Sequence, residues 1–191
     1  MNLIFIGGSF DPPHRGHYEI IRYCCEKCDQ LVLIPSNLSP LKHHPPVAEP
    51  HNRLKMLELL TQDFDFSIKI DDWELVQSGP NYTYQTIQYL QEQYPEYSIS
   101  MVIGADQLVK FQQWKKYKEI MSSIHIIGFN RSFCDYTPLS GMNFTWIEDF
   151  NVDISSTEIR EKIAKGQNIG DELSEPIQTY IQENNLYGYQ L

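Results

Sequence analysis

Two histidines three residues apart, His14 and His17, are the first side chains along the chain that could act on a ligand. They follow the glycine pair Gly7 and Gly8, and two prolines fix φ just before a helix expected to start near Arg15. A spacing of three places both rings on one face at the start of that helix, where unpaired N–H groups and the helix dipole attract anions. These residue types predict a phosphate-binding turn.

The strand that must position this turn runs from Leu3 to Ile6, because its apolar character is unbroken. Gly7 and Gly8 then let backbone N–H groups approach a ligand with no Cβ in the way. The turn fits neither G-x-x-x-x-G-K-[ST] nor G-x-G-x-x-G, so neither a P-loop nor a classical dinucleotide-binding turn is indicated. Taken alone, it also fits an ordinary strand-to-helix turn with two solvated histidines.

The whole turn, GGSFDPPHRGH from Gly7 to His17, resembles the GG-[TS]-F-D-P-x-H-x-G-H signature of nucleotidyltransferases with an H-x-G-H motif. Within that group it is most similar to the bacterial nicotinate-mononucleotide adenylyltransferases. A zinc site at the two histidines would need a third ligand and, in the zincin pattern, a Glu beside the first His, which is absent here.

Two segments in the middle of the chain resemble the same family. Residues 79–87, GPNYTYQTI, are similar to G-P-S-Y-T-x-D-T-L, although Gln85 replaces the family's Asp. Residues 103–108, IGADQL, followed by Trp114, are similar to the family's I-G-A-D-x-L and tryptophan. Taken alone, Thr83 and Asp106 are predicted helix caps and Trp114 a core aromatic residue.

A fourth match lies near the end of the chain, where ISSTEIR, residues 154–160, resembles the family's I-S-S-T-x-I-R. Its hydroxyls precede a helix expected near Thr157 to Lys165, whose start favours phosphate, and Arg160 adds a bidentate cation one turn later. The alternative is a capping arrangement with Arg160 in a surface ion pair.

Strands and helices alternate along the chain, which predicts an α/β domain with a mainly parallel sheet. The resemblance covers residues 1–191 as a single nucleotidyltransferase domain. It implies a Rossmann-like, doubly wound sheet of about five or six strands flanked by helices. The later strands are expected at Gln30–Ile34, Ser67–Ile70, Ser98–Ile103, Ile124–Phe129 and Asn143–Ile147, and further helices at His51–Thr61 and Glu175–Asn184. The proline-rich segment 36–50 is a long loop and therefore a candidate for function.

Composition excludes several classes of protein. The formal charge of −10 and the absence of a basic run argue against a nucleic-acid binder. No apolar stretch approaches the ~20 residues of a membrane span, and no leader is evident, so a cytoplasmic location is expected. Cys24, Cys25 and Cys28 are placed in the first helix, and together with Cys134 they are expected to be reduced thiols. His125, within an apolar strand, is predicted to be structural.

The resemblance implies transfer of an adenylyl group from ATP to nicotinate mononucleotide, giving deamido-NAD and pyrophosphate. The attacking phosphate is already anionic, so orientation and charge stabilisation are expected to matter more than a general base. The implied catalytic residues are His14, His17, Lys42 and Arg160. The implied ATP-binding residues are Gly7, Gly8, Ser9, Phe10, His14, His17, Gly104, Asp106, Ser155, Ser156, Thr157 and Arg160. The implied mononucleotide-binding residues are Ser9, Lys42, Thr83, Asp106, Trp114 and Lys115.

Magnesium is expected to accompany ATP, held chiefly by phosphates and water, with no resident metal site. The loop around Lys42 reads S-P-L-K where the family usually has P-P-H-K, so a histidine is missing there. A homo-oligomer is allowed by the resemblance. Three alternatives stay open at this point: another adenylyl- or cytidylyltransferase of the same fold, with pantetheine phosphate or a similar substrate; a catalytically silent nucleotide-binding regulator; and a zinc-binding interaction module.

Overall fold

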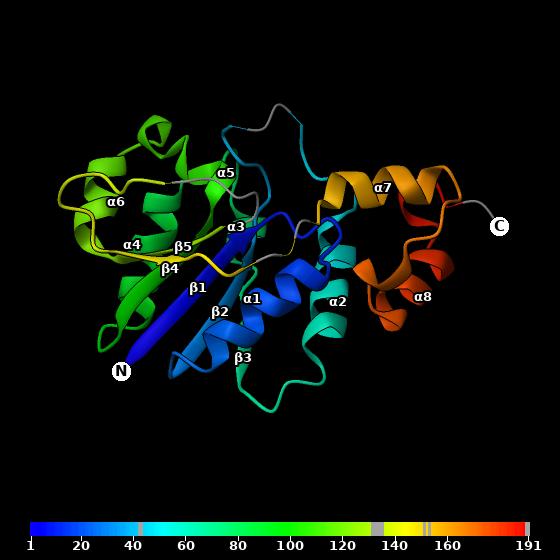
Figure 1. Ribbon diagram of the computed structural model, residues 1–191, viewed down its shortest axis with the longest axis horizontal. Helices are drawn as coiled ribbons and strands as arrows, with labels where there is room; N and C mark the ends of the chain where they lie inside the picture. Colours follow the sequence, from blue (N-terminus) through cyan, green and yellow to red (C-terminus); the bar gives the residue numbers. More distant parts are fainter. Residues whose placement is uncertain (42–43, 131–135, 151, 153, 190–191) are drawn as a thin grey trace.

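The computed structural model describes residues 1–41, 44–130, 136–150, 152 and 154–189. Within these ranges the chain forms a six-stranded sheet with helices on both sides (Figure 1). Lys42 and Cys134, which the sequence singled out, lie outside the described residues.

All the strand pairs are parallel, and the strands are arranged in the order β3-β2-β1-β4-β5-β6. Their bounds are β1 Asn2–Gly8, β2 Gln30–Pro35, β3 Ile68–Ile70, β4 Ser98–Gly104, β5 His125–Phe129 and β6 Phe144–Ile147. In register, Phe5 of β1 lies between Val32 of β2 and Met101 of β4. The chain moves outward from β1 in one direction and then from β4 in the other, so the strand order reverses between β1 and β4. This is the doubly wound arrangement that the resemblance implied, and ligands of such sheets bind at the carboxyl ends beside the reversal.

The helices follow the expected order, with two additions. They are α1 Arg15–Cys25, α2 Pro50–Thr61, α3 Trp73–Val76, α4 Thr83–Gln93, α5 Ala105–Leu108, α6 Tyr117–Ser123, α7 Ser156–Ala164 and α8 Glu175–Glu183, with 3-10 turns η1 Phe111–Gln113, η2 Gly170–Glu172 and η3 Leu186–Gly188. The short helices α3 and α6 were not anticipated, because four and seven residues carry too little apolar periodicity to stand out.

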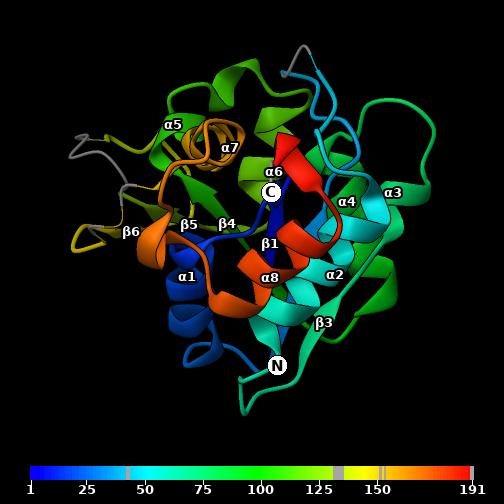
Figure 2. The ribbon, with the colours of Figure 1, turned by 90° about the vertical axis from the view of Figure 1, so that its right-hand side faces the viewer.

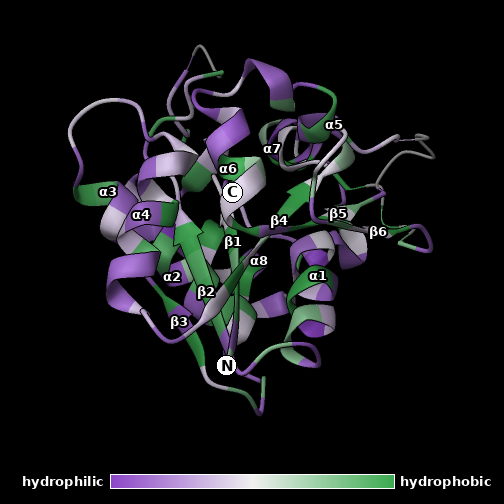
Figure 3. Ribbon diagram, turned by 90° about the vertical axis from the view of Figure 1, so that its left-hand side faces the viewer, coloured by the Kyte–Doolittle hydropathy of each residue, from purple (hydrophilic) through white to green (hydrophobic). Residues whose placement is uncertain are grey.

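The two faces of the sheet bury separate cores. Alternate residues of β1 point to opposite sides, so Ile4 and Ile6 pack with α1, α2, α7 and α8, whereas Leu3 and Phe5 pack with α4, α6 and η1. Figure 2 shows α2 and α8 side by side in front of the strands, and Figure 3 shows the strands as the most hydrophobic part of the ribbon. A sheet covered on both faces explains why its strands read as continuous apolar runs.

Cys24, Cys25 and Cys28 were expected in the first helix, and the structure places two of the three there. Cys24 and Cys25 lie in α1, but the helix ends there, so the placement of Cys28 in the helix was wrong. All three are free, and burial raises the pKa of each thiol, that of Cys25 to about 11. Protonated, partly buried thiols are poor nucleophiles and poor metal ligands.

Candidate active site

The phosphate-binding turn predicted from the sequence lies at the carboxyl end of β1, beside the point where the strand order reverses. His14 is the N-cap of α1, and its Nδ1 accepts a hydrogen bond from the backbone N–H of Gly16 at 3.1 Å. The Nδ1 of His17 accepts from the backbone N–H of His14 at 3.2 Å. The two rings are 3.9 Å apart between centroids, and Phe10 packs against His17 at 5.0 Å. The two histidines therefore form a reciprocal capping box at the start of α1.

This capping box fixes the chemistry of both rings. Since each Nδ1 accepts a backbone N–H, the hydrogen of the neutral ring sits on Nε2, so the donor atom of each ring is Nε2. The His14 side chain is almost fully buried, whereas that of His17 is half-buried. The arrangement provides two oriented donors at the positive end of a helix.

Gly16 is required by the same geometry. A Cβ built on Gly16 would meet Cε1 and Nδ1 of His14 at 3.0 Å, closer than such contacts normally are. Any side chain at this position would therefore push the His14 ring away from the N–H group that it caps. The glycine between the two histidines is thus a consequence of the cap.

The start of α7 closes the other side of the turn, although it lies more than 140 residues further along the chain (Figure 1). The Ser156 hydroxyl donates to the carbonyl of Pro12 at 2.9 Å. Ser155 is the N-cap of α7 and accepts from the N–H of Thr157 at 3.3 Å. The predicted hydroxyl cluster and the histidine turn are therefore brought together.

Arg160, one turn into α7, also reaches this turn. Its Nη1 donates to the backbone carbonyl of Asp11 at 2.6 Å, and its Nη2 donates to the Thr157 hydroxyl at 3.2 Å. The side chain is one-quarter exposed, and its Nη1 lies 3.8 Å from Oδ2 of Asp11. Arg160 is therefore partly exposed and partly engaged in holding the turn, and its role toward phosphate stays a prediction.

Asp11 is a buried carboxylate that the sequence analysis did not single out. Its Oδ1 accepts from the N–H of Ala48 at 3.0 Å and from the Tyr187 hydroxyl at 2.8 Å, and its Oδ2 accepts from the N–H of Val47 at 2.6 Å. The side chain thus joins the histidine turn, the end of the long loop 36–49 and the C-terminal turn η3. Its place inside the FDPP motif was a signal, but its partners could not be identified from the sequence.

Arg53 is the second residue that was missed. It is 1% exposed, and its Nη1 donates to the backbone carbonyls of Ser9 and Ser36, both at 2.8 Å, while its Nε donates to Ala48 at 3.2 Å. Burial lowers the pKa of this guanidinium, and nearby Asp11 opposes that shift. In the sequence, a cation in the first turn of α2 is typical of a surface residue, but here it binds the backbone of the histidine turn and of loop 36–49.

A second group of polar residues gathers where α4 begins. Asn81 is buried; its side-chain oxygen accepts from the N–H groups of Asn37 and Leu38, at 3.1 and 3.3 Å, and its amide donates to the carbonyl of Glu74 at 3.0 Å. The expectation that Thr83 caps this helix was wrong. Tyr82 occupies the cap position in an extended conformation, and Thr83 is the first helical residue. The residue before the cap, Asn81, is held by loop 36–38, since its N–H also donates to the carbonyl of Leu38 at 3.0 Å.

The remaining predicted residues lie around the same edge of the sheet. Asp106 is exposed in α5, directly after β4, and it is not the cap, since Gly104 occupies that position. Trp114 is half-buried against Phe111, with ring centroids 5.4 Å apart. The Lys115 ammonium lies 4.3 Å from the centre of the Tyr82 ring, which ties the segment after η1 to the start of α4.

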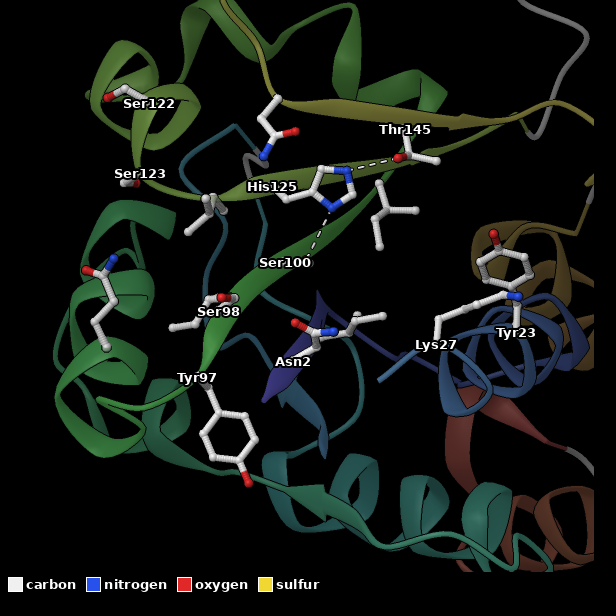
Figure 4. Close-up of a pocket in the computed structure, with 16 residues that line it drawn as sticks. Asn2, Tyr23, Lys27, Tyr97, Ser98, Ser100, Ser122, Ser123, His125 and Thr145 are labelled. Carbon is white, nitrogen blue, oxygen red and sulfur yellow. Dashed lines mark hydrogen bonds between the residues drawn. The ribbon is translucent and has the colours of Figure 1, made fainter. Parts of the chain in front are cut away.

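A hollow of about 630 Å³ lies at the opposite, amino end of the sheet (Figure 4). His125 occupies its centre, with Nδ1 3.3 Å from the Ser100 hydroxyl and Nε2 2.9 Å from the Thr145 hydroxyl. Both ring nitrogens thus have partners on neighbouring strands, and burial lowers the pKa of the ring. These contacts agree with the prediction that His125 is structural.

Among the described residues there is no group of three or more His, Cys, Asp or Glu side chains arranged to hold a metal ion. Nor does any helix in the described ranges have the length and apolar character needed to cross a membrane.

Comparison with known proteins agrees with the motifs. The cytidylyltransferase-like family matches residues 5–162. A relative from Chlorobium phaeobacteroides, described as a probable nicotinate-nucleotide adenylyltransferase, is 37% identical over 200 residues, which span 98% of this chain and 100% of the relative. A relative from Rhodopirellula baltica with the same description is 35% identical and covers 95% of this chain and 91% of its own. The chain belongs to the nicotinate-nucleotide adenylyltransferase family.

Family membership agrees with the three-dimensional comparison. The structure of Plasmodium falciparum nicotinic acid mononucleotide adenylyltransferase complexed with NaAD superposes with a TM-score of 0.84 over 99% of this chain and 98% of that chain. The identity is 21%, so this likeness establishes a shared fold. The Rossmann-like interpretation drawn from the sequence is confirmed.

Proposed function

We propose that the chain catalyses the reaction of ATP with nicotinate mononucleotide to give deamido-NAD and pyrophosphate. The observation that carries this proposal is the paired histidine cap of α1 beside the start of α7, in a chain similar over its full length to relatives described as nicotinate-nucleotide adenylyltransferases. Two helix starts and two Nε2–H donors form a site for a polyphosphate.

The reaction is an in-line displacement at phosphorus. An oxygen of the mononucleotide phosphate forms a bond to the α-phosphorus of ATP, and the bond from that phosphorus to the bridging oxygen of pyrophosphate breaks. The attacking oxygen is anionic at neutral pH and needs no strong base. The protein therefore contributes orientation and stabilisation of the charge that builds up on the α-phosphate and the leaving group.

We assign the triphosphate to the region between the starts of α1 and α7. Gly8 and Ser9 offer backbone N–H groups, and His14 and His17 donate from Nε2 to the reacting phosphates. Ser155, Thr157 and Arg160 hold the β- and γ-phosphates. Because the hydroxyl hydrogen of Ser156 is already donated to Pro12, we expect Ser156 to contact phosphate through its backbone N–H. Lys42, in the long loop, remains an additional proposed cation.

We assign the mononucleotide to the edge formed by the start of α4 and the segment after η1. Asp106, exposed after β4, is suited to accept hydrogen bonds from ribose hydroxyls. Trp114 offers a ring for stacking, and the N–H groups near Thr83, together with Lys115, suit the carboxylate of nicotinate.

Magnesium enters this proposal as part of the substrate, bound to ATP. The one buried carboxylate of the histidine turn, Asp11, has both oxygens occupied by N–H and hydroxyl donors, which disfavours it as a metal ligand. Phosphate oxygens and water would hold the ion, which neutralises charge on the leaving pyrophosphate. We also propose a cytoplasmic location, and assembly into a homo-oligomer remains a prediction.

The test is a coupled assay of dinucleotide formation and pyrophosphate release from ATP, Mg²⁺ and nicotinate mononucleotide. Parallel reactions replace ATP with CTP, or the mononucleotide with pantetheine phosphate, because the broader family is cytidylyltransferase-like. We expect product only from ATP with a pyridine mononucleotide. Product from a parallel reaction alone would move the chain to another enzyme of this fold, and binding without turnover would make it a regulator.

A further inference from the structure

The C-terminal turn η3 folds back onto the histidine turn. Tyr187 lies in this turn with its side chain largely buried, and its hydroxyl donates to Oδ1 of Asp11 across 176 residues of sequence. Tyr187 and Asn185 both have positive φ, 59° and 50°, a conformation that costs free energy for residues other than glycine. The backbone therefore adopts an unfavourable conformation in the segment that delivers this hydroxyl to Asp11.

The Tyr187 hydroxyl completes the solvation of a carboxylate that lies next to Arg160. Asp11 accepts two backbone N–H groups and this hydroxyl at 2.6–3.0 Å, with Tyr187 on Oδ1, whereas Nη1 of Arg160 stays 3.8 Å from Oδ2. Arg160 donates instead to the backbone carbonyl of the same residue. A direct Arg–carboxylate pair would be strong in a site this dry, so the three neutral donors keep Asp11 from drawing Arg160 in.

We propose that Tyr187 is a positioning residue for ATP, which acts by satisfying Asp11 so that the guanidinium of Arg160 stays directed to the triphosphate. This inference rests on the proposed function, in which Arg160 holds the β- and γ-phosphates. Without the hydroxyl, Asp11 keeps two backbone N–H donors, one on each oxygen, to share its negative charge. A movement of about 1 Å then brings Nη1 of Arg160 within hydrogen-bond distance of Oδ2. The charge of Arg160 is then shared with Asp11, and ATP binds more weakly.

The first experiment compares Tyr187→Phe with Tyr189→Phe. Tyr187→Phe removes the hydroxyl and keeps the ring in its packed position. Tyr189→Phe is the control, because it also removes a hydroxyl that takes part in a hydrogen bond, accepted from Nε2 of Gln182 at 2.5 Å. That hydrogen bond does not involve the histidine turn. We expect Tyr187→Phe to raise the KM and Kd for ATP about 3- to 10-fold, the weakening of one charged contact, with less than about 2-fold change for the mononucleotide. Tyr189→Phe should leave both near the wild-type values.

The second experiment tests whether the effect passes through Arg160, using the Kd of ATP measured by calorimetry so that turnover is not needed. If it does, adding Tyr187→Phe to Arg160→Ala should change that Kd by less than about 2-fold. Independent, multiplied effects of the two substitutions would overturn the proposal. So would a Tyr187→Phe enzyme with a lower Tm and equal losses for both substrates, because a purely structural contact would behave in that way.

The outcome for this inference is separate from that for the proposed function. A wild-type protein that forms no dinucleotide from ATP and nicotinate mononucleotide refutes the function itself. An active wild-type protein whose Tyr187→Phe variant binds ATP normally refutes only the positioning role.

Discussion

At the carboxyl end of the sheet, polar side chains join segments far apart in the sequence, whereas at the amino end they pair with neighbours on adjoining strands. Asp11 links residues 47–48 and 187, and Ser156 reaches back to Pro12. His125, by contrast, is held by Ser100 and Thr145 on the two flanking strands. Strands about 20 Å long separate these two regions.

The difference shows that a hollow is a poor guide to the site of this enzyme. The amino-end hollow is large, but the polar groups of its central histidine are already satisfied. The histidines at the carboxyl end use Nδ1 for backbone caps, which places the hydrogen of each neutral ring on Nε2, the atom that we propose donates to phosphate. We therefore expect substitutions at the carboxyl end to alter catalysis and those at the amino end to alter stability alone.

The largest effect is expected for His17→Ala. Because a donor to the reacting phosphates acts mainly in the transition state, kcat should fall about 10²-fold or more, with a smaller change in KM for ATP. Steady-state kinetics and circular dichroism on the same preparation would measure activity and folding together. A folded variant with near-normal kcat would remove His17 from the reaction.

The next prediction concerns the pyridine base. Nicotinate carries a carboxylate where nicotinamide carries an NH₂, so a site made of N–H donors and Lys115 favours the acid and opposes the amide. We expect nicotinate mononucleotide to be preferred by at least ~10²-fold in kcat/KM. Trp114→Ala should weaken the binding of both mononucleotides and leave the binding of ATP unchanged. Similar kcat/KM values for the two mononucleotides would contradict this specificity and leave adenylyl transfer intact.

Arg160→Ala should weaken the binding of ATP more than that of the mononucleotide, since the residue lies at the proposed β- and γ-phosphate end. We expect the KM for ATP to rise by roughly 10-fold or more. Arg160→Lys should restore only part of the binding, because an ammonium cannot donate both to the Asp11 carbonyl and to a phosphate in the planar fork geometry. The KM values for the two substrates, measured with the other at saturation, provide the test. Equal losses for both would refute the assignment.

Much of the fold was accessible from the sequence, because each strand is a continuous apolar run and the sheet is covered on both sides. The histidine turn was also recognisable, since its spacing and glycine are local features. The partners of Asp11 and Arg53 were not, because these contacts depend on how loops 9–14, 36–49 and 186–188 come together. Thr83 was misassigned for the same reason: its position in α4 depends on contacts that Asn81 makes with a distant loop.

An effect on stability rather than on activity is expected at Glu74, a buried carboxyl of the carboxyl-end region. Burial raises its pKa from an ordinary value near 4.5 to about 7, although a 2.5 Å hydrogen bond from Thr86 opposes the shift. Between these pH values the unfolded chain has released the proton and the folded chain has kept it, so rising pH favours unfolding. The free energy of unfolding should therefore fall by about 3 kcal/mol from this group as pH rises from 4.5 to 7. Urea titrations of the Glu74→Gln variant across this pH range should not show that fall in the free energy of unfolding. If the free energy of unfolding depends on pH in the variant as it does in the wild type, the prediction is contradicted.

The smallest effect is expected at His125, at the amino end, and its pH dependence should have the opposite sign. His125→Ala leaves the Ser100 and Thr145 hydroxyls without their imidazole partner and should cost about 1 kcal/mol near pH 8, with kcat and both KM values unchanged. Burial lowers the pKa of His125 below its ordinary value of 6.5. As pH falls below 6.5, the imidazole therefore becomes protonated in the unfolded chain while it stays neutral in the folded chain. Acid therefore destabilises the wild-type protein through this group but not the variant, and the difference in their unfolding free energies should narrow as pH falls from 8 toward 5. A His125→Ala enzyme that folds normally but loses turnover would show that the amino-end hollow takes part in the reaction, and the contrast between the two ends of the sheet would no longer hold.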